Sequence, residues 1–576
     1  MNGIVIGLAA AVLLLGFLWI GRMLEKRWGI DPARETPSQD CFDGKDYVPT
    51  PKIVVLGHQF SSIAGAGTIV GAVIAASYGW LPALLWVLVG SLVFGAAHDF
   101  GALFASLRHK GRSLGRVLRD CVGEKAQRLF TVFALLTLVL LIAGFTNIVA
   151  KTFASAGGEL VSVGFGKVSP AASAGTASIL FVLVALLFGL LVFRKNLPML
   201  PVTLLCLLLM AGSVWAGLCF GLNLPYAVWV GVIAVYIVAA SLAPVWSLLQ
   251  PRDFLSAFLL WGMMLFCLAA LIIPQFTTKI EPMPAFTGFT NSWGPMIPTL
   301  FAVLAGGAVS GYHALIAAGT TSKQLANEKH ARGVSVGALL LDALLAVIAI
   351  AAVSNRNVFV RLDSFSSPLA AFSTGIATAW SAIGSGFDAA PVENGLVYAL
   401  VTVTVSVFAL TTLDTITRLA RYLFAELFNP ENRRLAKLEG AQRFFAAPAV
   451  GTILVVLLGC GLGLFPETGR LWGLFGAANL LLAGLAMLAV AAWLRQSGKG
   501  GGLLTLLTLV LLLLGMGTLA YLLGVGVGRL AAGAFAWVDA LGLVCGLALA
   551  VLALILLVRC LPALFKKPEE AADDAD

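Results

Sequence analysis

Four ionisable residues lie inside long apolar stretches, where they could bind and release protons. They are His58, Asp99, His313 and Asp342. An ionisable group at bilayer depth costs at least ~2.5–3.5 kcal/mol, so it needs a partner or a function. Histidine titrates near neutral pH, and burial disfavours the charged form of a carboxylate such as Asp342. The residue types predict proton coupling. The simpler alternatives are neutral histidines that are hydrogen-bonded to backbone carbonyls, and an Asp99 that is solvated at a helix end.

A second group of polar residues occupies 411–418. Asp414 and Arg418 are four residues apart, which is an ion-pair spacing on one helix face, and a structural salt bridge is the simplest interpretation of the pair. Thr411 and Thr412 precede them, and their hydroxyls together with backbone carbonyls near 62–64 would suit a hard monovalent cation. Sodium coupling therefore stays open beside proton coupling.

Two apolar segments, 53–77 and 297–318, have glycine and other small residues in their middle. Glycine costs roughly 1 kcal/mol relative to alanine in a helix, and unwound backbone survives in a membrane only where it is covered by protein or lines a cavity. We expect both helices to be interrupted, with their inner N-termini binding a carboxylate. Close helix packing through small residues is the alternative. The expected substrate-binding residues are Gly65, Ala66, Gly67, Gly307, Ser310 and Gly311.

The composition indicates that all of these residues belong to a membrane protein. Of 576 residues, 60% are apolar and 11% charged, which excludes a water-soluble globule and a disordered chain. The apolar residues form blocks of about 20, the length of a membrane-spanning helix. We predict an all-α polytopic protein with fifteen spans and a re-entrant or interfacial segment at 369–384. The spans are approximately 3–20, 53–77, 81–107, 129–150, 176–194, 199–221, 226–247, 254–274, 297–318, 333–354, 396–420, 444–464, 471–493, 503–525 and 535–558.

The cationic residues predict the orientation of these spans. Basic residues follow the first apolar block, so it is not expected to be a cleaved signal, and the N-terminus is placed outside. Alternation then puts 30 of the 37 Lys and Arg residues on the cytoplasmic side, as the positive-inside rule requires, with an acidic cytoplasmic tail. Lys323 lies on that side and could either contact a leaving anion or anchor the chain; with Arg418 it is a candidate for gating.

Several classes of function are excluded by the same sequence. The net charge of +9 lies between apolar blocks, which argues against nucleic-acid binding. There is no P-loop or HExxH motif, so we expect neither ATP hydrolysis nor another enzyme activity, and no cofactor. The eight cysteines show no CxxC pair, and no third ligand is visible beside the two histidines, so no metal site is expected. A nutrient-binding membrane sensor remains an alternative, although no cytoplasmic loop is long enough for an output domain.

Four long motifs resemble the bacterial carbon starvation protein A family. They are DGKDYVPTPKIVVLGHQFSSIAGAGTIVGAVIAA, GAAHDFGALFASLRHKGRSLG, GGAVSGYHALIAAGTTSKQL and FALTTLDTITRLARY, and the resemblance covers roughly 42–425. It implies an uptake system of the bacterial cytoplasmic membrane, linked to peptide use during starvation, with related members that import pyruvate with protons. It also implies a five-plus-five inverted-repeat core, in which 53–77, 297–318 and 396–420 would be core helices 1, 6 and 8.

The expected protein is therefore a secondary active importer of a small carboxylate-bearing nutrient, with peptides first and pyruvate second. By our topology the two glycine-rich segments run in opposite directions, which is typical of inverted-repeat transporters with a midplane site. The expected division is an accessory helix at 1–20, a first repeat with extra helices at 53–275, a second repeat at 297–493, accessory helices at 503–558 and a cytoplasmic tail at 559–576.

Overall fold

The structure, a computed structural model, is a bundle of long helices. It describes residues 3–154, 160–162, 166–276, 283–385, 395–431, 433, 435–534 and 536–565. Eleven continuous helical stretches in this part of the chain are long and apolar enough to cross a membrane. They are α1 (Gly3–Trp28), α5 (Trp80–Val89) with a π-helical turn (Gly90–Gly95) and α6 (Ala96–Arg108), α8 (Glu124–Phe153), α9 (Pro170–Gly189), α10 (Met199–Cys219), α12 (Leu249–Ile272), α15 (Ala331–Val353), α18 (Gly395–Phe428), α21 (Trp472–Gln496), α22 (Gly502–Ala531) and α23 (Trp537–Cys560).

Bent or short helices lie at the other predicted spans. The pair α3 (Lys52–Ile63) and α4 (Ala66–Ala76) is bent by 44°, and the pair α19 (Gly440–Ala446) and α20 (Pro448–Gly463) by 64°. The segment 226–247 contains α11 (Tyr226–Leu242), and 297–318 contains α13 (Met296–Val303) and α14 (Gly311–Gly319). Every predicted span thus coincides with helix, while fifteen complete crossings remain a prediction.

The remaining elements are one helix of 18 residues and several short helices and strands. The segment predicted at 369–384 forms α17 (Pro368–Ser385), which packs against α4, α15 and α18. Most of its described side chains are buried against these helices, and a re-entrant or interfacial position stays a prediction. The short helices are α2 (Pro37–Asp40), α7 (Leu114–Val122) and α16 (Arg356–Phe359), and the strands form two antiparallel pairs, β1 (Val161–Ser162) with β2 (Lys167–Val168) and β3 (Thr290–Asn291) with β4 (Gly294–Pro295).

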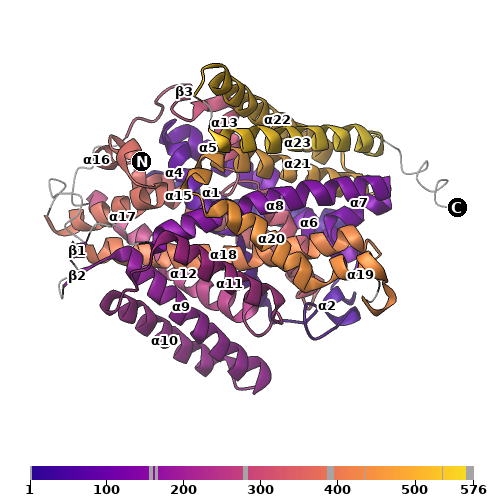
Figure 1. The fold of residues 1–576 in the computed structure, drawn as a ribbon, viewed down its shortest axis with the longest axis horizontal. Coiled ribbons are helices and arrows are strands. Elements are labelled where there is room, and N and C mark those ends of the chain that lie inside the picture. The colour runs from indigo at the N-terminus through magenta and orange to yellow at the C-terminus, as the bar shows by residue number, and fades with distance from the viewer. Residues whose placement is uncertain are drawn as a thin grey trace.

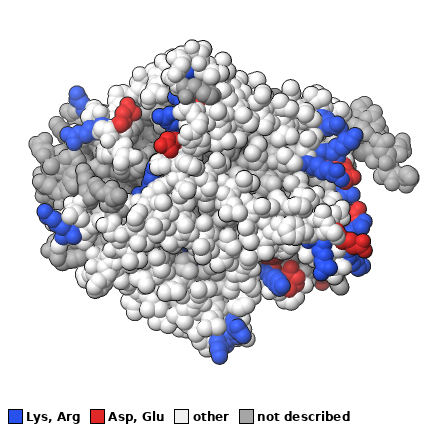
Figure 2. Space-filling view, in the orientation of Figure 1, with Lys and Arg blue, Asp and Glu red and all other residues white. Residues whose placement is uncertain are grey.

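Most helices run along the long axis of the molecule (Figure 1). In this view α1 begins at the left end and α23 ends at the right end. Charged residues gather toward these two ends, most densely at the right, and a wide band between them is almost free of charge (Figure 2). The apolar stretch of α21 is 94% buried inside the protein, against 22% for that of α1. The apolar stretches of α15 and α18, which carry Asp342 and Asp414, are 83% and 72% buried, so these helices are also central, and α1 is peripheral.

Two breaks in the helices bring backbone segments together at the centre. Helix α3 ends at Ile63, and Gly65 has an extended backbone before α4 begins. Residues 304–310 separate α13 from α14. A Cβ atom at Gly306 would lie 3.3 Å from the backbone of Thr68, and one at Gly71 would collide with the carbonyl oxygen of Val303. The absence of side chains at these glycines lets the two interrupted helices lie against each other.

Candidate proton-coupling and substrate site

The two interrupted helices are paired in opposite order. The second half of one, α4, packs against the first half of the other, α13, and α3 packs against α14. The predicted interruption of both segments is confirmed. The unwound segments meet where Gly306 lies beside Thr68. This crossing point is the frame of the candidate site.

Three of the four predicted proton-binding residues come together at this crossing. His313 on α14 lies between two carboxylates: its Nδ1 is 3.3 Å from Asp99 Oδ2 on α6, and its Nε2 is 3.8 Å from Asp342 Oδ2 on α15. Thr68, on α4, donates to Asp342 Oδ1 at 2.7 Å, and the Nδ1 of His98 is 2.7 Å from Asp99 Oδ1. We call these five residues the Asp342 cluster. It joins α4, α6, α14 and α15.

The Asp342 cluster is buried and incompletely hydrogen-bonded. All five side chains are at most 1% exposed, so Asp99 is not the solvated helix end that was one alternative. Among the described residues, Asp99 Oδ2, His313 Nδ1 and Asp342 Oδ2 have no hydrogen-bond partner. A buried polar atom without a partner is unfavourable by about 1–3 kcal/mol. Two carboxylates and two imidazoles in one buried cluster can take up or release a proton, which changes how strongly they attract one another.

His58 belongs to a different cluster. Its Nδ1 is hydrogen-bonded to the carboxylate of Asp253 on α12, and its Nε2 is 2.9 Å from Thr320 Oγ1, just after α14. Ser62 Oγ lies 3.4 Å from Asp253 Oδ2 and 3.3 Å from Thr415 Oγ1. Sequence reasoning missed Asp253, because it stands at the edge of an apolar segment and resembles a surface residue. No group of three or more potential metal-ligating His, Cys, Asp or Glu side chains was found in the described part of the chain.

The predicted ion pair between Asp414 and Arg418 is wrong. Asp414 forms its ion pair with Arg252 on α12 and accepts a hydrogen bond of 2.5 Å from Tyr236 on α11. Arg418 instead donates to the carbonyl oxygens of Ala240 and Ala243 at 2.7 Å each. The last carbonyls of a helix lack intrahelical partners and attract cations. The end of α11 therefore takes Arg418, and packing against α12 supplies the partner of Asp414.

The two threonines proposed for sodium point to different neighbours. Thr412 lies beside the first break, where a Cβ atom at Gly65 would be 2.6 Å from its Oγ1. Thr411 Oγ1 is instead 3.3 Å from Ser256 Oγ on α12. Thr412 is therefore placed beside the unwound backbone, whereas the side-chain neighbour of Thr411 is on α12.

The inner N-terminus of α14 is covered by protein. Asn479 of α21 accepts hydrogen bonds from the Tyr312 backbone N–H at 3.0 Å and from the Ser310 hydroxyl at 3.1 Å. A Cβ atom at Gly311 would lie 2.5 Å from Leu482 Cβ, and one at Gly307 would lie 2.5 Å from Ala346 Cβ. Binding of a carboxylate at Gly307, Ser310 and Gly311, as at Gly65, Ala66 and Gly67, therefore stays a prediction that needs these contacts to open.

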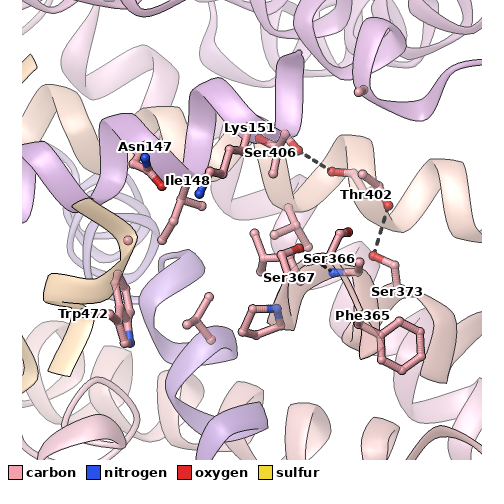
Figure 3. Close-up of a pocket in the computed structure, with 18 of the residues that line it drawn as sticks. Asn147, Ile148, Lys151, Phe365, Ser366, Ser367, Ser373, Thr402, Ser406 and Trp472 are labelled. Atoms are coloured by element: carbon pink, nitrogen blue, oxygen red, sulfur yellow. Dashed lines mark hydrogen bonds between the residues drawn. The ribbon is translucent and has the colours of Figure 1, made fainter. Parts of the chain in front are cut away.

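A cavity of about 950 Å³ approaches the crossing from one end of the bundle. Val70 of α4, two residues after Thr68, lies in its wall, as do Lys151 of α8 and Arg361 near the start of α17. In Figure 3, Asn147, Lys151, Ser367, Thr402 and Trp472 surround one open space. Sequence reasoning missed this cavity, because its described wall comes from α4, α8, α9, α16, α17, α18 and α21 and no local motif unites them.

The opposite end of the bundle is closed by the loop before α3. The Val48 N–H donates to the carbonyl oxygen of Lys323 at 3.2 Å, and the Thr50 N–H to that of Gln324 at 3.0 Å. Asp46 accepts a hydrogen bond of 2.6 Å from Tyr422 and lies 3.3 Å from Arg418.

Lys323 itself lies in the same closure, with its Nζ 3.9 Å from the centre of the Tyr422 ring. We call Asp46, Lys323, Arg418 and Tyr422 the inner gate. Burial lowers the pKa of Lys323 to about 8, although Asp46 opposes the shift. For Asp46, burial is the largest single influence and raises the pKa, but Lys323, Arg421 and Arg418 together hold it below its usual value.

A bundle of apolar helices with two interrupted members, a buried ionisable cluster at their crossing and a cavity leading toward it defines the class of helical membrane transporters. The family model described as "Carbon starvation protein CstA" matches residues 2–386 and 361–519. The chain belongs to this carbon starvation protein family. The match extends beyond the motif region at 42–425 at both ends.

Curated relatives carry the same family name. The chain is 30% identical over 552 residues to a "Peptide transporter CstA" of Helicobacter pylori, with 84% of this chain and 76% of that protein covered. It is 30% identical over 535 residues to the Bacillus subtilis protein of that name, with 85% and 84% covered. A "Pyruvate/proton symporter BtsT" of Escherichia coli is 33% identical over 347 residues, which cover 57% of this chain and 46% of that protein.

A solved structure shares the fold. The crystal structure of the manganese transporter of Eremococcus coleocola, in complex with an aromatic bis-isothiourea substituted compound, matches with a TM-score of 0.51. The match covers 91% of this chain and 99% of that chain at 11% sequence identity. At this identity the likeness concerns the fold alone.

Proposed function

We propose that this protein imports peptides across the bacterial cytoplasmic membrane by secondary active transport driven by protons. One observation carries the proposal: both interrupted helices contribute a side chain to the Asp342 cluster, Thr68 from α4 and His313 from α14. The names of the full-length relatives support the peptide as substrate.

The Asp342 cluster would couple the proton through the half-helices. A proton on Asp342 or Asp99 removes a negative charge from beside His313, and so weakens the attraction that holds α14 between α6 and α15. Because α4 and α14 are short and end in unwound backbone, each can shift against its neighbours without bending a long helix. Binding of substrate near α4 and of a proton at Asp342 would then bias the same rearrangement.

Pyruvate is the second candidate substrate, because one relative is named as a pyruvate/proton symporter. Sodium is the second candidate for the coupling ion, since Thr412 lies beside the break at Gly65. A nutrient-binding sensor would use the same cavity but would not accumulate its ligand. The first two alternatives differ from the main proposal in the substrate or in the coupling ion. The third differs because the ligand is bound but not transported.

The proposed orientation places the N-terminus outside and the C-terminus in the cytoplasm. Supporting it, α1 begins and α23 ends at opposite ends of the bundle (Figure 1), and Lys and Arg gather most densely at the end where α23 stops (Figure 2). The cavity would then open outward, with the inner gate shut. We further propose that 53–275 and 297–493 contain two inverted five-helix repeats, in which α3–α4 and α13–α14 are equivalent.

Uptake into proteoliposomes tests this function. Labelled dialanine and labelled pyruvate are offered to the purified full-length protein with an imposed pH gradient, an imposed sodium gradient, or neither. We expect dialanine to accumulate only with the pH gradient. Accumulation only of pyruvate, or only with sodium, would favour the corresponding alternative, and binding without accumulation under every condition would favour a sensor.

A further inference from the structure

The walls of the outward cavity are charged with one sign only. Lys151 and Arg361 lie in its wall, and none of the lining residues that the structure describes is acidic. Lys151 is solvent-exposed at the end of α8, and its Nζ donates one hydrogen bond of 3.2 Å to the carbonyl oxygen of Pro466. An ammonium group has three donors, so at least two hydrogens of Lys151 remain for a ligand.

The second cation stands beside a helix start. Arg361 is also exposed and lines the cavity. Ser366 and Ser367, just before α17, line the cavity, and Ser367 Oγ accepts a hydrogen bond of 3.2 Å from the Ala370 N–H. The start of an 18-residue helix carries partial positive charge. Two cations and a helix N-terminus thus share one space, which favours an anionic group.

The rest of the cavity is suited to an amide chain. On α18 and α17, the Thr402 hydroxyl donates to Ser373 Oγ at 3.1 Å and Ser406 donates to the Thr402 carbonyl (Figure 3). These hydroxyls can accept hydrogen bonds from peptide N–H groups. Ile148 and Trp472 also line this space, and their apolar surfaces can contact side chains. The volume of about 950 Å³ lies at the upper end of the usual range for small-molecule sites, well beyond what a three-carbon acid fills.

We propose that this cavity is a peptide-binding site that recognises the terminal carboxylate through Lys151 and Arg361, and that its described residues provide no charge partner for the terminal ammonium. The inference rests on the proposed function and adds the recognition rule. A peptide whose ammonium is blocked should bind as well as a free one, and a peptide whose carboxylate is blocked should not. Pyruvate has the carboxylate but none of the amide and side-chain contacts, so it should bind more weakly.

Competition binding measures this asymmetry. Labelled dialanine bound to the full-length protein in nanodiscs is displaced by dialanine, N-acetyl-dialanine, dialanine amide or pyruvate. We expect the acetylated peptide to match dialanine and the amide to be weaker by about tenfold or more, as a charge-assisted hydrogen bond at a partly exposed site implies. Lys151→Gln keeps a donor for Pro466 and should weaken dialanine by a similar factor, while Lys151→Arg should restore most of the binding. Lys167→Gln, an exposed lysine on β2 outside the cavity wall, is the matched control.

The outcomes separate this inference from the proposed function. Equal displacement by dialanine and its amide, or unchanged binding by both Lys151→Gln and Arg361→Gln, would overturn the site even if the wild-type protein accumulates peptide. Stronger displacement by pyruvate than by dialanine would overturn the peptide assignment of the cavity. Asymmetric binding without proton-driven accumulation would support the site and contradict the proposed transport. If dialanine amide binds more weakly than dialanine in the wild type, and the two bind equally in Lys151→Gln, the contact between Lys151 and the carboxylate is assigned directly.

Discussion

Closure of the inner gate should become more favourable as the pH rises. In the closed arrangement burial lowers the pKa of Lys323 from its ordinary 10.5 to about 8. When the gate opens and Lys323 is hydrated, its pKa returns toward the ordinary value. The open state therefore binds more protons between these two values, and raising the pH favours the closed state even though deprotonation removes the attraction between Lys323 and Asp46.

The size of this effect follows from the two pKa values. Between about pH 7 and about pH 9 the open-to-closed free energy should change by about 1.3 kcal/mol in favour of closure, a factor of about nine in the population ratio. Lys323→Gln removes the titrating group and should abolish this dependence. Asp46 contributes nothing over this interval, because its pKa is lowered from an already acidic value and it stays ionised.

Pulsed electron spin resonance can measure the two populations without a pH-sensitive reaction. Spin labels at the exposed positions Phe42 and Phe444 would report on the loop before α3 and on α19, in a variant lacking the eight native cysteines. We expect the closed fraction to rise from pH 7 to pH 9 in the otherwise unaltered protein and to stay constant in Lys323→Gln. A shift of equal size in Lys323→Gln, or a shift toward the open state, would refute the reasoning.

Three further predictions concern packing, buried charge and the coupling ion. Gly71→Ala should lower the free energy of unfolding by about 1–3 kcal/mol, because its Cβ would press on the Val303 carbonyl. Gly262→Ala, whose Cβ meets no atom within 4 Å, should leave the melting temperature in detergent unchanged or higher. Equal melting temperatures of the two variants would contradict this. Asp414→Ala should destabilise the protein by about 3–5 kcal/mol, because Arg252 would be left charged and unpaired. The double variant Arg252→Met/Asp414→Leu should recover most of this loss. If thermal unfolding shows no recovery, the result would argue against the ion pair. Thr412→Ala should leave pH-driven dialanine uptake unchanged, and a selective loss of uptake in sodium-containing buffer would instead place a sodium ion at the break.

The spans and the two interruptions could be predicted because each depends on residues that are close together in the sequence. Hydropathy over about 20 residues identifies a membrane helix, and clustered small residues such as Gly65 and Gly311 mark positions where a helix can end. Ionisable residues in apolar segments also need partners, which is why His313 and Asp342 could be singled out before their contacts were known. Their meeting with Asp99 depends on the packing of α6 and α15 against α14, which no local pattern predicts.

Partners that are distant in sequence could not be predicted in the same way. Helical spacing suggested Arg418 for Asp414, but the true partner, Arg252, lies 162 residues away on α12. Asn479 is a lone amide in an apolar segment, and only the packing of α21 against α14 reveals that it caps the helix. Lys151 and Arg361 counted only as loop cations in the topology, because the cavity that they share exists only after several helices distant in sequence have assembled.

The central claim is that the coupling proton binds where the two interrupted helices meet, and Asp342→Asn tests it most directly. The substitution keeps the shape and the hydrogen bond from Thr68 but removes the proton-binding carboxylate. Reconstituted Asp342→Asn should exchange labelled for unlabelled dialanine but fail to accumulate it under a pH gradient, while Asp363→Asn, an exposed aspartate near α16, should behave as wild type. Accumulation by Asp342→Asn at the wild-type level would contradict the account.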